Sequence, residues 1–330
     1  MNPQTIDQPR PQRTPVVAPG HVQPHARDMS VEASADVTLG EINNQLAELS
    51  PVPQWLPLDG ESDATLRELI DVDSTGVLRT NFGGWRDRLT GIQFTGGDGR
   101  LVSAGGLPVK NVAGYDLVKL MVGSRGAFGR LVTVTARTVR RPDVAFVQDI
   151  DTTTNAPAEI VGDLLTSDVP PQWLRLTSDG LRAGWLAIED DANALAQALP
   201  NAERHSLEDD DDERRPRPSA CRCVVPAATV ATFVAELDAD GHGGRWVADP
   251  VAGVVWCDHD VSADATRHGG HAIATDNNGS RIVGLSRGAA SILRELKAQF
   301  DPDGTLPALP QLGEDRLEAS PTHAIDSDDR

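Results

Sequence analysis

The chain has few cysteines and no long apolar run. Its cysteines are Cys221, Cys223 and Cys257, and such a sparse, odd-numbered set excludes a disulfide framework and indicates a reducing compartment. No apolar run approaches the roughly 18 residues that are needed to cross a bilayer. The first residues lack the continuous apolar segment of a signal peptide. We therefore expect a cytoplasmic protein.

Basic residues are also scarce. The chain has 30 Lys and Arg against 49 Asp and Glu, which gives a net charge of −19. A phosphate backbone or an anionic membrane would repel such a surface, so the charge argues against a nucleic-acid partner. Residues 204–219 hold an acidic block that solvates itself, and we expect an exposed loop there.

Residues 31–142 alternate strand and helix signals. After a short strand, Thr38 is placed to cap a helix, and Glu41 stands three residues later, which is the spacing of a capping box. A glycine-rich turn separates two apolar runs in residues 91–105 and predicts a hairpin. Residues 130–137, RLVTVTAR, alternate apolar and polar side chains and predict a strand with one buried face.

Residues 143–310 interleave helix and strand patterns and predict a second α+β domain. This region closes with a helix over GAASILRELKAQF. We expect no packed structure in residues 1–30, which are polar and rich in proline, or in residues 311–330, which are polar. The predicted fold class is therefore α+β, with two domains.

The stretch GGLPVKNVAGYDLVKLMVGSRGAFGR, residues 105–130, is rich in glycine and holds Tyr115, the chain's single tyrosine. A helical pattern, LVKLMV, ends at Gly123 as it would at a C′ glycine. Gly123, Gly126 and Gly129 stand three residues apart. Glycine permits positive φ and has no Cβ, so successive N–H groups can line a concavity that holds an anion or a ring edge. On spacing alone, a connection that merely turns the chain is the alternative.

This stretch resembles the signature of FAD-linked oxidases with a PCMH-type FAD-binding domain, the vanillyl-alcohol-oxidase type, as found in the FAD-binding subunit of bacterial glycolate oxidase. The likeness extends back through WRDRLTGIQF and forward to VRRP, and it returns in LKAQFDPDGTLP. It covers residues 31–142 and 285–307. The resemblance implies that a flavin is lined by these residues of the stretch: Lys110, Asn111, Gly114, Tyr115, Asp116, Gly123, Ser124, Gly126 and Gly129.

The chain departs from this family pattern in two places. The family's Gly-Gly-Gly-Thr-like loop for the FAD pyrophosphate has no counterpart, so we expect an FAD-binding domain that is N-terminally truncated or degenerate; a misplaced start codon is the alternative. The family's Gly-Ala-Thr-Leu-Gly-Gly run reads DATLRE here, so Arg67 and Glu68 replace two glycines. Bulky residues obstruct a backbone that must approach a ligand. The residues that still correspond, and that the resemblance places near FAD, are Ala64, Thr65, Leu66, Ser74 and Gly76.

Two functions follow from the resemblance. The first is an FAD-dependent oxidoreductase subunit that oxidises a 2-hydroxy acid. It would work with a paralogous larger flavin subunit and an iron–sulfur subunit, and the complex could bring this cytoplasmic chain to a membrane. The second is a flavin-free, non-catalytic assembly partner from the same family.

No catalytic residue or metal site stands out. A histidine base would have to come from the second domain, where nothing chooses among His242, His259, His268 and His271. The pattern CDHDVSADATRHGGH fits no structural zinc spacing, and the chain lacks the clustered cysteines of an iron–sulfur site. We expect the tryptophans to be core residues, with Trp85 the one that lies near a flavin.

Overall fold

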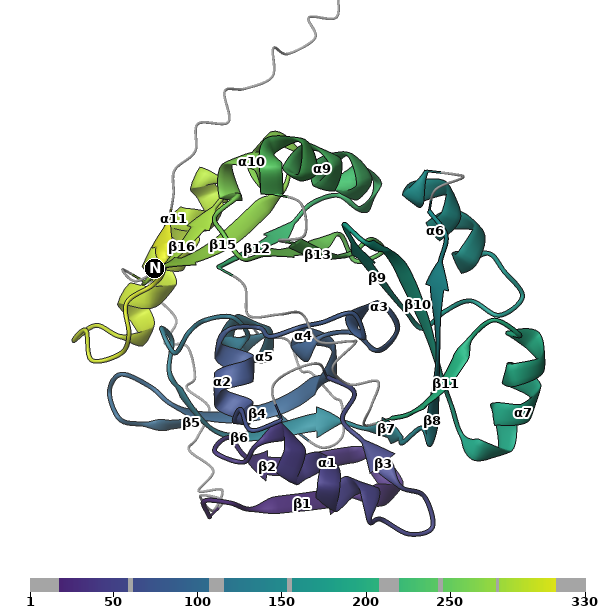
Figure 1. Cartoon of the computed structure of the whole chain (residues 1–330). Helices are drawn as coiled ribbons and strands as arrows, with labels where there is room; N and C mark the ends of the chain where they lie inside the picture. Colours follow the sequence, from purple (N-terminus) through teal and green to yellow (C-terminus); the bar gives the residue numbers. More distant parts are fainter. Residues whose placement is uncertain are drawn as a thin grey trace, which may run out of the picture.

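The computed structural model describes residues 18–58, 62–106, 116–152, 156–207, 220–242, 246–276 and 279–312. Two sheets organise them (Figure 1). The smaller sheet and its helices form what we call the first lobe. The larger sheet and its helices form the second lobe, which curves over the first lobe (Figure 1). The fold is thus a mixed α/β arrangement.

The first lobe is built on a five-stranded antiparallel sheet with strand order β1-β2-β6-β4-β5. Its strands are β1 (Val22–His25), β2 (Ser30–Ser34), β4 (Leu89–Thr95), β5 (Leu101–Gly105) and β6 (Arg130–Arg137). Its helices are α1 (Leu39–Ala47), α2 (Leu66–Asp71), α3 (Arg79–Phe82), α4 (Trp85–Arg88) and α5 (Leu117–Met121). The short strands β3 (Gln54–Trp55) and β7 (Val139–Arg140) pair beside the sheet.

Local sequence signals explain most of these elements. Thr38 and Glu41 form the predicted capping box, because the Glu41 carboxylate accepts the Thr38 N–H at 2.9 Å. The predicted hairpin is formed by β4 and β5. The prediction for β6 was wrong in one respect, since Thr133 and Thr135 are buried as well as the apolar residues. Both faces of β6 are therefore covered by other parts of the chain.

The second lobe is built on a ten-stranded sheet with strand order β11-β8-β10-β9-β13-β14-β12-β15-β16-β17. Its strands are β8 (Val144–Ile150), β9 (Trp173–Thr177), β10 (Gly180–Ala187), β11 (Glu203–Ser206), β12 (Cys221–Val224), β13 (Trp246–Asp249), β14 (Val254–Cys257), β15 (His271–Asp276), β16 (Gly279–Val283) and β17 (Gln311–Leu312). Helices α6 (Pro157–Leu165), α7 (Glu189–Ala198), α9 (Val230–Leu237) and α10 (Ser262–Arg267) lie on its outer side (Figure 1). Its inner side faces the first lobe.

An apolar cluster joins the two lobes. Val77 and Leu78, which precede α3, pack with residues of β8, β9 and β10, among them Trp173. All of the tryptophans are buried, with exposures of 7% or less, so the prediction that they are core residues is confirmed. Near this cluster, the Thr80 hydroxyl donates to the buried Asp249 carboxylate at 2.7 Å.

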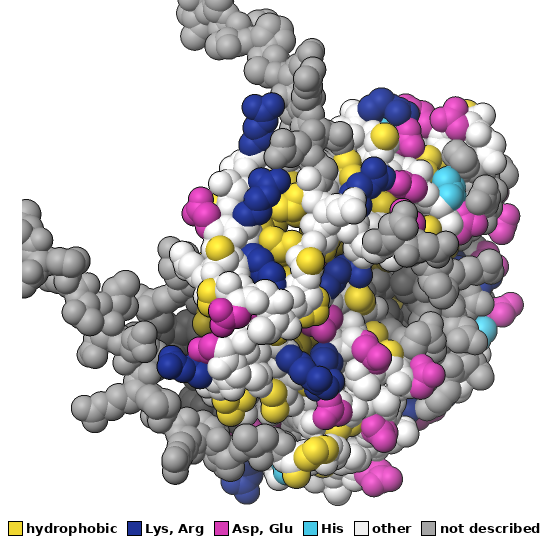
Figure 2. Space-filling view, turned by 90° about the vertical axis from the view of Figure 1, so that its left-hand side faces the viewer, with side chains coloured by type: hydrophobic (Ala, Val, Ile, Leu, Met, Phe, Trp, Pro, Cys, Tyr) yellow, Lys and Arg dark blue, Asp and Glu magenta, His cyan; other side chains and the backbone are white. Residues whose placement is uncertain are grey.

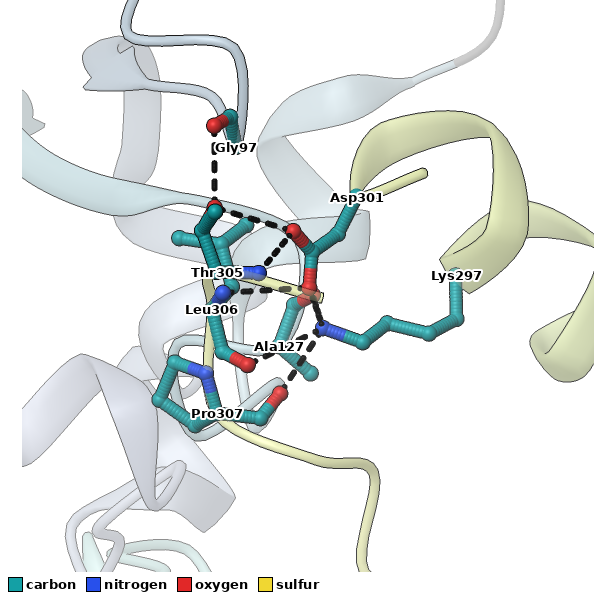
Figure 3. A network of polar contacts seen from close by, with 7 residues as sticks. All are labelled: Gly97, Ala127, Lys297, Asp301, Thr305, Leu306 and Pro307. Carbon is teal, nitrogen blue, oxygen red and sulfur yellow. Dashed lines mark hydrogen bonds and ion pairs between the residues drawn. The ribbon is translucent and has the colours of Figure 1, made fainter. Parts of the chain in front are cut away.

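Helix α11 (Arg287–Phe300) returns from the second lobe to the first. Its Lys297 ammonium donates to the carbonyl of Ala127, at 3.0 Å, and to the Asp301 carboxylate, at 2.6 Å (Figure 3). Asp301 also accepts the N–H groups of Thr305 and Leu306, at 2.7 and 3.0 Å. The closing sequence FDPDGTLP is therefore a turn, built around one buried carboxylate, that fixes the end of α11 against the first lobe.

Some segments differ from the predictions. Residues 22–25 were expected to lack structure, but they form β1, which pairs with β2 along its full length. Residues 204–206 were placed in an exposed loop, yet they belong to β11. Edge pairing stabilises both segments because a neighbouring strand offers free N–H and C=O groups, which composition alone does not reveal. Within the described residues, no helix is long and apolar enough to cross a membrane.

Candidate functional site

The glycine loop, residues 123–129, follows α5 as predicted. Gly123 and Gly126 have φ of +78° and +75°, so both need the conformational freedom of glycine. The N–H of Gly123 donates to the carbonyl of Ile70 at 2.9 Å, and the N–H of Arg125 donates to that of Asp71 at 2.9 Å. These amides therefore hold the loop against the end of α2.

The other amides of the loop are engaged as well. The N–H groups of Ser124, Ala127 and Gly129 each donate to the carbonyl three residues back along the chain, with distances of 3.2, 3.0 and 3.3 Å. The Gly126 N–H donates to the Asp71 side chain. The predicted row of N–H groups open to a ligand is therefore wrong for this loop, since every amide from Gly123 to Gly129 except that of Phe128 has a partner in the protein.

Protein atoms also fill the space that the missing side chains leave. A Cβ on Gly126 would lie 3.5 Å from Pro307, in the closing turn (Figure 3). A Cβ on Gly129 would lie 2.4 Å from the ring of Phe94. Gly129 thus permits the close packing of Phe94 on the loop, while Gly126 lies within ordinary contact distance of the closing turn.

The amides at the start of α2 are also bonded within the protein. Thr65 caps the helix, and the Glu68 carboxylate accepts the Thr65 N–H at 2.9 Å in a second capping box. The N–H groups of Leu66 and Arg67 donate to the carbonyls of Val37 and Ala35, both at 2.9 Å. The amides that would face a diphosphate at this helix start are therefore occupied.

Arg67 and Glu68, which replace two family glycines, stabilise the fold. The Arg67 guanidinium donates to the Leu131 carbonyl at 3.0 Å and pairs with Asp36. Glu68 completes the capping box, and its hydrogen bonds from Thr65 hold the pKa of its carboxyl below the ordinary value. One face of α2, with Leu66, Leu69 and Ile70, packs into the core.

The remaining predicted site residues have separate structural roles. Ala64 is half-buried and its carbonyl accepts the N–H of Leu39, while Leu66 is a core residue. Ser74 donates its N–H to Leu69, Gly76 is buried, and Asp116 caps α5 by accepting the Lys119 N–H at 3.2 Å. Four predicted residues lie outside the described part of the chain: Lys110, Asn111, Gly114 and Tyr115.

A group of arginines lies where the two lobes meet, and sequence reasoning missed it. We call Arg79, Arg86, Arg125 and Arg222 the junction cluster; their mutual repulsion adds to burial in lowering the pKa of Arg222. Arg222, on β12, donates to the Asp73 carbonyl and lies 3.6 Å from its carboxylate. Basic side chains gather around the opening between the lobes (Figure 2). No motif connects these arginines, because they come from four separate elements.

Several polar atoms beside this cluster are buried without a hydrogen-bond partner. They include the hydroxyls of Thr75 and Ser124, the indole nitrogen of Trp85 and one oxygen of Asp71. Burial raises the pKa of Asp71 to about 6, against the opposing charges of Arg67 and Arg125. Unpaired polar atoms are uncommon in protein interiors, and they mark this region as one that a ligand could satisfy.

The described residues do not fit FAD in the way that the resemblance implies. The amides at the start of α2 and in the glycine loop are bonded within the protein, and Pro307 and Phe94 fill the space beside the glycines. The junction cluster could attract an anion, but it lacks the backbone approach on which the predicted flavin site depended.

Among the described residues, the candidate histidines and cysteines do not form a catalytic or metal site. His259 pairs with Asp258, and His268 pairs with Glu236. Desolvation and the charge of Arg222 lower the pKa of His271. The three cysteines are free and buried. Across the described ranges, no group of three or more His, Cys, Asp or Glu could hold a metal ion.

Comparison of the sequence with curated proteins finds oxidases and dehydrogenases. The chain is 30% identical over 132 residues to glycolate oxidase subunit GlcD of Bacillus subtilis, which is 38% of this chain and 27% of that protein. It is 37% identical over 100 residues to glycolate oxidase subunit GlcE of Escherichia coli, 29% of this chain and 28% of that protein. It is 33% identical over 84 residues to D-lactate dehydrogenase of Archaeoglobus fulgidus, 26% of this chain and 18% of that protein. No protein-family model matches the chain.

Solved structures share the fold over most of the chain. Alkyldihydroxyacetonephosphate synthase superposes with a TM-score of 0.55 at 14% identity, over 85% of this chain and 64% of that chain. FgChi7B superposes with a TM-score of 0.54 at 13% identity, over 87% of this chain and 78% of that chain. At these identities the likeness concerns the fold alone.

Proposed function

The chain resembles the FAD-linked oxidases, and from this premise we propose that it is a subunit of a flavin-dependent complex that oxidises a 2-hydroxy acid. We propose further that it acts there as an assembly partner and that another subunit holds the flavin. The observation that carries this role is the hydrogen bonding of the amides in the glycine loop and at the start of α2.

The relatives support the first part of this proposal. Two of them are named as subunits of glycolate oxidase, and others are D-lactate dehydrogenases, so their substrates are 2-hydroxy acids. The partners that we propose are a larger paralogous flavin subunit and an iron–sulfur subunit, within a cytoplasmic or membrane-associated complex. The chain has three cysteines, all buried free thiols, and the usual iron–sulfur cluster takes four, which supports placing any cluster on a partner.

A second candidate is that this chain itself binds FAD. It is favoured by the buried hydroxyl of Ser124, a predicted site residue that has no partner in the protein, and by the positive charge of the junction cluster. In that case FAD would accept a hydride from the substrate carbon. The bonded amides argue against this candidate.

The test is to purify the tagged chain from its own cells under mild conditions, in parallel with the chain made alone. Flavin content and the reduction of a dye by glycolate or D-lactate are measured for both. We expect flavin and activity in the preparation that contains partners and neither in the isolated chain. Activity with bound flavin in the isolated chain would select the second candidate, and a partner-containing preparation without either would reject the complex.

A further inference from the structure

The junction cluster concentrates positive charge in a chain whose net charge is −19. Its arginines come from α3, α4, the glycine loop and β12, which are far apart in the sequence. Arg79, Arg86 and Arg125 all lie close enough to Arg222 to lower its pKa. A Cβ on Gly123 would lie 3.4 Å from Asp73 and 3.8 Å from the guanidinium of Arg86. Guanidinium groups that meet in this way repel one another unless an anion lies among them.

Only part of this charge is balanced within the protein. Arg222 is paired with Asp73, and Arg86 donates to the Val122 carbonyl at 2.9 Å, which is a neutral acceptor. The guanidinium groups of Arg79 and Arg125 make no hydrogen bond or ion pair with the residues that the structure describes. Two cations therefore stand at the junction of the lobes without a bonded counter-charge.

Two nearby carboxyl groups have raised pKa values. Burial raises the pKa of Asp71 to about 6, and burial also raises the pKa of Asp249. A carboxyl with a raised pKa gives up its charge more readily, so it offers less counter-charge to the arginines. The four arginines of the cluster thus face three nearby carboxyl groups, Asp71, Asp73 and Asp249, so a net positive charge remains at the junction.

Two buried hydroxyls supply donors next to these cations. Thr75 and Ser124 are 4% and 6% exposed, and neither hydroxyl has a partner. Thr75 and Arg79 flank the same residue, since a Cβ on Gly84 would lie 3.2 Å from the Thr75 methyl and 3.9 Å from the Arg79 guanidinium. A buried hydroxyl without a partner is costly, and an oxyanion can accept a hydrogen bond from it.

We propose that the junction cluster binds a small dianion, a dicarboxylate or a phosphate, with Arg79 and Arg125 as its guanidinium partners. Both kinds of ligand present oxygens that match the planar fork of arginine. Thr75 and Ser124 add hydroxyl donors. This inference goes beyond the proposed function, because it concerns a ligand of the isolated chain and requires no flavin.

The experiment is isothermal titration of the isolated full chain, at low ionic strength, with oxalate, inorganic phosphate and acetate. We expect saturable binding of oxalate or phosphate, and binding of acetate that is at least about tenfold weaker, because one charge is missing. Preference for oxalate would identify a dicarboxylate as the ligand, and preference for phosphate would identify a phosphate. No saturable binding of either dianion, or binding of acetate as tight as theirs, would overturn the proposal.

Variants locate the site. Arg79→Gln and Arg125→Gln should each weaken binding of the preferred dianion about tenfold or more, since each removes a charge-assisted bond. Arg100→Gln removes the same charge on the exposed β4–β5 hairpin, 78% exposed in its side chain, and should leave the affinity unchanged. Circular dichroism and urea unfolding check that each variant folds. If one junction variant does not fold, the other still tests the proposal. Equal affinities in all three variants would refute the assignment.

Discussion

Restoring two family glycines, with Arg67→Gly and Glu68→Gly together, tests whether these residues block a flavin or stabilise α2. In the structure both stabilise the helix: Glu68 completes the capping box with Thr65, and Arg67 binds the Leu131 carbonyl and Asp36. We therefore expect a less stable protein that still binds no FAD, because the amides of the glycine loop remain bonded.

The expected loss of stability follows from these contacts. Each glycine in a helix costs up to about 1 kcal/mol relative to a good helix former. Loss of the Glu68 half of the capping box costs about 0.5–1 kcal/mol, and loss of the Arg67 contacts, which are partly exposed, costs about 1 kcal/mol. The free energy of unfolding should fall by about 3–4 kcal/mol, a large part of the usual 5–15 kcal/mol.

Urea unfolding followed by circular dichroism measures this loss, and a fluorescence titration with FAD measures flavin binding. A matched control is Asp264→Gly with Arg267→Gly in α10, another six-residue helix, which has no side-chain cap. The control should lose about half as much, since only helix propensity and one surface pair change. An unchanged unfolding midpoint in the α2 variant, together with stoichiometric FAD uptake, would refute the reasoning.

Two further predictions concern packing and pH. Gly184→Ala should destabilise the second lobe by about 1–3 kcal/mol in urea unfolding, because the new Cβ would lie 1.9 Å from the fully buried ring of Trp173. An unchanged unfolding midpoint would contradict this packing. The hydrogen bond from Lys297 is the largest of the effects that lower the pKa of Asp301 to about 2. The stability that the ionised carboxylate gives is therefore present above its ordinary pKa of 3.8 and is lost as the pH falls through about 2. Asp301→Asn should expose the C-terminal turn to proteolysis at neutral pH, and equal cleavage of both proteins would contradict the role of the network.

The sequence predicted the local elements best where a motif has a physical cause within a few residues. The capping box at Thr38, the end of α5 at Gly123 and the helix of the closing sequence are all confirmed. The second capping box, Thr65 to Glu68, has the same local T-x-x-E pattern and starts α2 in the same way.

The candidate site could not be predicted in the same way. Whether the amides of the glycine loop are open depends on Ile70 and Asp71, about 50 residues earlier in the chain, whose carbonyls happen to face them. The junction cluster depends on β12 of the second lobe, which lies over the first lobe only once both sheets have formed. Such long-range contacts have no local pattern in the sequence.

The proposed role as an assembly partner requires that the isolated chain hold no flavin. The direct measurement is the absorbance spectrum of the purified chain near about 450 nm, where flavins absorb, followed by equilibrium dialysis against FAD. The bonded amides of Gly123 to Gly129 predict no flavin band and no saturable uptake. A flavin band that survives dialysis, with one FAD per chain, would contradict this and return the chain to the flavin-binding role.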